Sequence, residues 1–172
     1  DLAYHPDGEV GSFTLFHLER VFVSPLSKAL FYRPLVNSLS IGFAVTAIAV
    51  STGSLLAWLI VRTNLRFKRP LAALVIVPYM MPSWVIALAW LDLFKNDRIG
   101  GAKGLVASLF GVNPPDWVSY GFFPIVVTLS LHYFAYAYLL MSGALASVDS
   151  ELEEAGAIAG MGRWTRVWRI TL

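Results

Sequence analysis

Residues 37–61 read NSLSIGFAVTAIAVSTGSLLAWLIV and contain no Asp, Glu, Lys or Arg. A helix rises about 1.5 Å per residue, so roughly 20 apolar residues are needed to cross the hydrocarbon core of a bilayer. The stretch is therefore long enough to span a membrane. Its small residues, among them Gly42 and Gly53, allow neighbouring helices to approach closely.

The segment that follows, RTNLRFKRP at 62–70, holds the densest basic cluster in the chain and no acidic residue. Short loops rich in Lys and Arg stay in the cytoplasm. Two further charge-free stretches come later, LAALVIVPYMMPSWVIALAWL at 71–91 and a third at 122–146. Because 62–70 is placed in the cytoplasm, the three predicted spans run outside to inside, inside to outside, and outside to inside.

Composition supports a membrane protein. Of the 172 residues, 57% are hydrophobic and 14% are charged, whereas about a quarter are charged in ordinary soluble domains. The net charge of +2 comes from basic residues beside long apolar runs, which argues against a nucleic-acid partner. The chain has no cysteine, and this excludes disulfides, thiol catalysis and cysteine metal sites within it.

These observations predict an all-α, polytopic transmembrane helix bundle. Residues 1–36 mix charges, prolines and apolar side chains, and we expect them to form short helices or loops in an extracytoplasmic or interfacial segment. Residues 37–172 form the membrane domain. Since three spans alone cannot enclose a pathway, we expect partner helices and a longer polypeptide that continues beyond Leu172.

The segment at 147–172 predicts a helix–turn–helix on the cytoplasmic surface. Three glutamates stand near its start, where they favour a helix N-terminus. Gly160 and Gly162 suit a chain reversal. After the reversal, Trp164 and Trp168 share one helix face and three arginines share the other, a composition typical of an interfacial helix.

This segment resembles the EAA loop of ABC importer permeases. The family pattern reads E-A-A, three residues, G, nine residues, I, any residue, L-P. The matching positions are Glu154, Ala155, Gly156, Gly160, Ile170 and Leu172, with glycine in place of the second alanine at 156. The resemblance implies that these residues couple the permease to a cytoplasmic ATPase.

The same resemblance implies the rest of the assembly. The chain would be a multi-pass protein of the bacterial inner (plasma) membrane, surrounded by lipid and not itself an enzyme. Its partners would be an ABC ATPase dimer that holds the ATP, a second permease subunit or half, and a periplasmic substrate-binding protein. The chain itself would bind no cofactor, and it lacks a phosphate-binding loop with glycines and a lysine.

The substrate is suggested only by the run VPYMMPSWVIALAWLDLF at 77–94, which resembles permeases of the ferric-iron type. Permeases for polyamines, thiamine and phosphonate are close alternatives. Two other classes stay open as well. A membrane-embedded enzyme would need paired carboxylates, which the spans lack, and a purely structural membrane protein would have no ATPase partner.

Within the spans, Pro78 and Pro82 lie four residues apart, so both interrupt helical hydrogen bonds. They predict either a hinge beside the pathway or a static, packed kink. Thr128, His132 and Tyr136 share one helix stripe, and ionisable groups in membrane spans are functional candidates. The alternative is a neutral His132 hydrogen-bonded to a neighbouring helix. We expect no metal site here, because in the resembled family the external binding protein holds the metal.

Overall fold

The computed structural model describes residues 15–147, 158–162 and 165. The chain divides into two units, 1–43 and 44–172, which are described separately. Every regular element in the described residues is a helix, as the all-α prediction requires. Five residues of the predicted coupling segment lie outside the described residues: Glu154, Ala155, Gly156, Ile170 and Leu172.

The first unit contains α1 (Phe16–Phe22), a π-helix η1 (Lys28–Tyr32) and the start of α2 (Arg33–Arg62). The hydroxyl of Tyr32 donates a hydrogen bond to the carbonyl oxygen of Phe22 at 3.1 Å. The rings of Phe22 and Phe31 meet edge to face, with centroids 4.7 Å apart. These contacts hold α1 against the π-helix. The prediction that this segment lies outside the membrane or at its surface stays a prediction.

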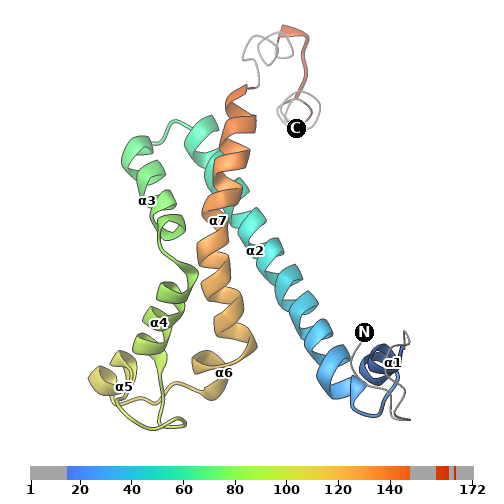
Figure 1. Ribbon diagram of the computed structural model, residues 1–172. Helices are drawn as coiled ribbons and strands as arrows, with labels where there is room; N and C mark the ends of the chain where they lie inside the picture. Colours follow the sequence, from blue (N-terminus) through green and yellow to red (C-terminus); the bar gives the residue numbers. More distant parts are fainter. Residues whose placement is uncertain (1–14, 148–157, 163–164, 166–172) are drawn as a thin grey trace. The chain divides into compact units, whose positions relative to one another are not determined.

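The second unit is built around α7 (Phe122–Ser147), and α2 and α3 (Lys68–Met80) share a core with it (Figure 1). Buried residues of all three helices form one apolar cluster: Ala57, Ile60, Val75, Tyr138 and Leu145. The predicted spans at 37–61 and 122–146 correspond to α2 and α7. Helix α2 begins four residues earlier than predicted, at Arg33, because it continues directly from the π-helix.

The predicted second span, 71–91, is not one continuous helix. It is divided into α3 and α4 (Ser83–Phe94), whose axes are bent by 94°. Met81 and Pro82 between them are extended, with ψ angles of 137° and 138°. In the described residues, only Lys28–Arg62 and Asp116–Ser147 are helical stretches able to cross a membrane unaided. The third crossing requires α3 and α4 to act together as a broken span.

The connection from α4 to α7 is an ordered cap with two short helices, α5 (Leu105–Phe110) and α6 (Asp116–Ser119). Buried Asn96 donates through Nδ2 to the carbonyl of Pro114 at 2.9 Å and to Asp116 at 2.8 Å. Arg98 pairs with the same Asp116 at 3.1 Å. This network ties the end of α4 to the start of α7.

Two ends of the second unit can be distinguished (Figure 1). Nη2 of Arg62, at the end of α2, donates to the carbonyl oxygen of Leu145 near the end of α7 at 3.0 Å. The basic loop after α2 and the chain after α7 therefore leave the unit at the same end, while α5 and α6 lie at the other. This arrangement agrees with the predicted topology, which places both 62–70 and 147–172 in the cytoplasm.

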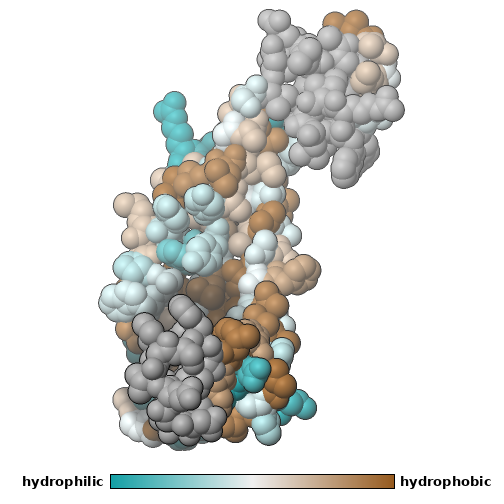
Figure 2. Space-filling view, turned by 45° about the vertical axis from the view of Figure 1, so that its right-hand side comes forward, coloured by the Kyte–Doolittle hydropathy of each residue, from teal (hydrophilic) through white to brown (hydrophobic). Residues whose placement is uncertain are grey.

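Brown hydrophobic residues are spread over the coloured part of the face in Figure 2, among more polar ones. Large apolar side chains are exposed on the helices, for example Leu74 at 65% and Trp84 at 64%. Such surfaces are expected where helices contact lipid or further helices rather than water.

Candidate functional site

The candidate site is centred on the break between α3 and α4. The ring of His132, on α7, places Nδ1 3.2 Å from the carbonyl oxygen of Pro78 near the end of α3. A carbonyl oxygen only accepts hydrogen bonds, so Nδ1 is the donor. The structure thus brings together two predicted residues, Pro78 and His132. His132 is therefore hydrogen-bonded to a neighbouring helix, as the alternative prediction for this residue stated.

Three tyrosines surround this hydrogen bond. The ring of Tyr79 stacks on His132 with centroids 6.0 Å apart and lies 6.2 Å from the ring of Tyr136. Tyr133 meets His132 edge to face at 5.1 Å. We call Tyr79, His132, Tyr133 and Tyr136 the tyrosine–histidine cluster. Each of its tyrosines is between 44% and 51% exposed.

This cluster presents polar and aromatic groups along a membrane-spanning segment. A tyrosine offers an apolar ring and a hydroxyl that both donates and accepts hydrogen bonds. Exposed hydroxyls in a span are expected to face partner helices or a water-filled cavity rather than lipid. Sequence reasoning missed Tyr79, although its position between Pro78 and Pro82 indicated a polar aromatic residue beside a helix break.

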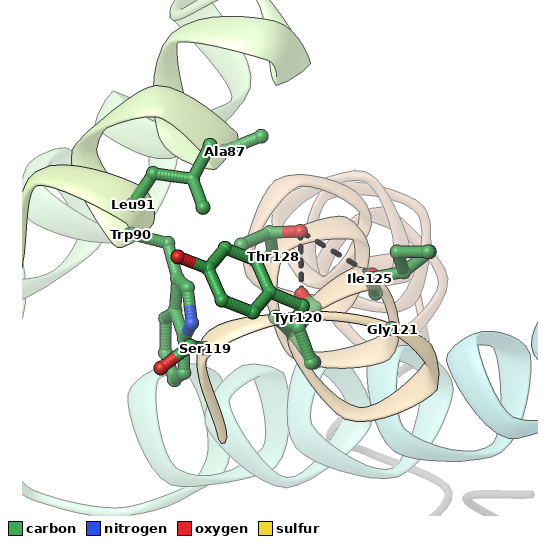
Figure 3. Close-up of a pocket in the computed structure, with 9 residues that line it drawn as sticks. Ala87, Trp90, Leu91, Ser119, Tyr120, Gly121, Ile125 and Thr128 are labelled. Carbon is green, nitrogen blue, oxygen red and sulfur yellow. Dashed lines mark hydrogen bonds between the residues drawn. The ribbon is translucent and has the colours of Figure 1, made fainter. Parts of the chain in front are cut away.

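Thr128, the remaining predicted residue of the stripe, is separate from the cluster. Its hydroxyl donates to the carbonyl of Pro124 in its own helix at 2.7 Å, and it is buried. Thr128 lines a cavity of about 200 Å³ between α4, α6 and α7 (Figure 3). The lining residues are Ala87, Trp90, Leu91, Ser119, Tyr120, Gly121, Pro124, Ile125 and Thr128.

The polar groups around this cavity already have partners within the protein. Nε1 of Trp90 donates to the carbonyl oxygen of Val118 at 2.9 Å. The hydroxyl of Ser119 donates to the carbonyl oxygen of Phe94 at 2.5 Å. The walls therefore offer mainly apolar and aromatic surface. Ligand sites for drug-sized molecules usually exceed about 300 Å³, so this cavity suits a small group rather than a larger ligand.

The cap beyond the cavity holds an ionised carboxylate that is paired with a lysine. Asp97 accepts a hydrogen bond from Asn113 at 2.6 Å and pairs with Lys103 at 3.3 Å. The hydrogen bond from Asn113, followed by the contact with Lys103, lowers the pKa of the Asp97 carboxyl below its ordinary value. The carboxylate is therefore ionised at neutral pH. Across the described ranges, no group of three or more His, Asp and Glu residues is placed to hold a metal ion.

Of the predicted coupling segment, Gly160 is described. Its φ angle is +79°, a left-handed conformation that glycine adopts without steric cost. Ile158, two residues before it, is 88% exposed. Gly160 thus adopts a backbone angle that suits the predicted chain reversal, while the reversal itself and the pairing of this segment with an ATPase stay predictions.

Residues 49–172 match the sequence profile of a family described as "Binding-protein-dependent transport system inner membrane component". Two characterised relatives align with most of the chain. The galactooligosaccharides transport system permease protein GanP of Bacillus subtilis is 26% identical over 100% of this chain and 42% of GanP. The maltose/maltodextrin transport system permease protein MalF of Escherichia coli is 30% identical over 89% of this chain and 30% of MalF.

The chain spans less than half the length of these relatives. The fold is also similar to a chain in the crystal structure of a bacterial ABC transporter involved in the import of the acidic polysaccharide alginate. That likeness has a TM-score of 0.71 and 18% identity, and it covers 94% of this chain and 56% of the other. It supports the same helical arrangement.

Proposed function

Because the chain belongs to the family of binding-protein-dependent transport system inner membrane components, we propose that it forms part of the substrate pathway of an ABC importer. The observation that carries this proposal is the family match over 49–172, which includes the predicted coupling segment. In this proposal the chain is not an enzyme. ATP is hydrolysed by a separate ATPase dimer, and a periplasmic binding protein delivers the substrate.

Coupling to the ATPase is assigned to the segment around Glu154, Gly160 and Leu172. The cytoplasmic end of α7 leads directly into it, and Arg62 ties that end to α2. A displacement of the docked segment would therefore act on α7, which carries His132, Tyr133 and Tyr136 of the tyrosine–histidine cluster. A second permease subunit or half would supply the opposite wall of the pathway.

A carbohydrate is the proposed substrate. The two relatives are named as permeases for galactooligosaccharides and for maltose and maltodextrin. Ferric iron, suggested by the resemblance of residues 77–94, finds no support in these relatives, and polyamine, thiamine and phosphonate find none either. The exposed tyrosines of the cluster suit a carbohydrate, because aromatic rings contact apolar sugar faces while hydroxyls bond sugar hydroxyls.

We place the cluster on the pathway and expect Tyr136→Ala to impair uptake. Removal of one aromatic contact of about 1 kcal/mol corresponds to a roughly fivefold rise in KM for the sugar. The measurement is uptake of radiolabelled maltodextrin and galactooligosaccharide by the full-length permease assembled with its ATPase and binding protein. Uptake of ferric ion is measured in parallel.

The matched variants are Tyr136→Phe, which keeps the ring, and Leu131→Ala, which shortens another exposed side chain of α7. Tyr136→Phe should retain most of the uptake, and Leu131→Ala should leave it unchanged. Normal sugar uptake by Tyr136→Ala would remove the cluster from the pathway. Uptake of ferric ion without either sugar would overturn the substrate proposal.

A further inference from the structure

The break between α3 and α4 leaves carbonyl groups in the last turn of α3 without helical partners, and that of Pro78 is one of them. In an α-helix the carbonyl of a residue accepts from the N–H four residues later. The partner of Pro78 would be residue 82, and Pro82 has no N–H. Freed backbone groups at membrane depth must be satisfied by a neighbouring helix, a side chain or water.

His132 supplies the missing donor. Its Nδ1 lies 3.2 Å from the oxygen of Pro78, and a hydrogen bond to this carbonyl requires a proton on Nδ1. The ring plane is held from two directions, by the stacked Tyr79 and by the edge-to-face Tyr133. These two ring contacts favour one orientation of the imidazole, and in that orientation Nδ1 faces the carbonyl oxygen of Pro78.

We propose that His132 is a positioning residue that replaces the N–H missing at Pro82 and thereby fixes the bend of the broken span. The bond joins the middle of α7 to the last turn of α3, next to the extended residues Met81 and Pro82. It also sets the position of Tyr79, which follows Pro78 in the chain and stacks on His132. Only the importance of this Tyr79 position for transport rests on the proposed carbohydrate pathway.

The competing explanation is local. Extended backbone at Met81 and Pro82 would fix the 94° bend by itself, and the histidine would add nothing to it. The two explanations differ in what happens when the donor is removed. If His132 fixes the bend, its loss allows α3 and α4 to vary in angle. If the local backbone fixes the bend, the angle is unchanged.

The bend is measured as a distance between nitroxide labels on Arg69→Cys in α3 and Leu93→Cys in α4, in the full-length protein in lipid nanodiscs with no other reactive cysteine. Both positions are exposed. A straight helix would separate them by about 36 Å, and a right-angle bend at residue 81 shortens this to about 25 Å. Pulsed electron paramagnetic resonance resolves this difference.

With His132 intact we expect a narrow distribution near the shorter distance. His132→Leu should broaden it and shift it by several ångströms toward the longer distance. His132→Asn should keep the native distribution, because its side-chain amide nitrogen reaches the place of Nδ1. A native distribution in His132→Leu would overturn the proposal. Because these distances are measured without substrate, failure of the carbohydrate proposal would leave this result unaffected.

If His132→Leu does not fold, His132→Gln takes its place. The amide nitrogen of glutamine reaches the place of Nε2 rather than that of Nδ1, so the side chain stays polar while the bond to Pro78 is lost. A broadened distribution in His132→Gln beside a native one in His132→Asn supports the proposal. Native distributions in both variants overturn it.

Discussion

Gly53→Ala should destabilise the full-length protein by about 1 to 3 kcal/mol, the usual cost of an added group in a well-packed core. A Cβ atom at Gly53 would lie 2.5 Å from the carbonyl oxygen of Phe134 and 2.7 Å from Cβ of Ala137. Both neighbours belong to α7, and the first is backbone, which cannot turn aside. The methyl group would therefore force α2 and α7 apart.

The measurement is the thermal unfolding midpoint of the purified protein in detergent, together with the yield of monodisperse protein. Gly143→Ala is the matched control, because it adds the same methyl group to α7 where no atom of the described part of the chain lies within 4 Å. We expect the control to keep the native midpoint. Equal midpoints for the two variants would show that α2 and α7 do not pack at Gly53.

Gly160→Val should reduce ATP-driven transport about tenfold or more while the spans still insert. Gly160 has a φ angle of +79°, and a left-handed conformation costs an L-residue roughly 1 to 2 kcal/mol, with β-branched residues affected most. Because a tenfold change corresponds to about 1.4 kcal/mol, strain at this turn alone is of the right size. The measurements are ATPase co-purification and uptake by the assembled transporter.

Two variants separate the turn from a general defect in the segment. Gly162→Ala adds a methyl group two residues away, where among the described residues the hydroxyl of Thr165 alone comes within 4.0 Å and no positive φ is required. It should transport normally. Gly160→Asn should recover part of the activity, because asparagine tolerates the left-handed region. Normal coupling in Gly160→Val would contradict the role assigned to this turn.

Much of the fold could be predicted because the membrane restricts the chain to few structures. Charge-free runs of about 20 residues or more are candidates for spanning helices, and this located α2 and α7 to within a few residues. The basic loop at 62–70 oriented them. The hydrogen bond from Arg62 to Leu145 agrees with that orientation, since it joins the two ends that were placed in the cytoplasm.

The break in the second span could be predicted only in part. Pro78 and Pro82 indicated that helical hydrogen bonds were lost, but a proline inside a span can either kink a continuous helix or divide it. The extended conformation of Met81 decides for division. A proline favours extended backbone in the residue before it, but this local preference does not fix the angle between the two helices.

The candidate site illustrates the same limit. Thr128, His132 and Tyr136 share a helix stripe in sequence, yet the structure separates Thr128 from the other two. The hydroxyl of Thr128 bonds to its own helix, whereas His132 reaches Pro78 across the helix interface. Partners from distant parts of the chain cannot be read from spacing along one helix. Tyr79, which links His132 to Tyr136, was missed for this reason.

The central claim is that the segment after α7 docks on a cytoplasmic ATPase. It is tested by single cysteines at Ile158 and at Ile99, which are 88% and 67% exposed, in full-length protein with no other cysteine. A membrane-impermeant crosslinker is added to inside-out vesicles, and captured proteins are identified by mass spectrometry. We predict that Ile158→Cys captures an ABC ATPase and that Ile99→Cys does not react. Failure of Ile158→Cys to capture the ATPase, or its capture by Ile99→Cys, would contradict the account.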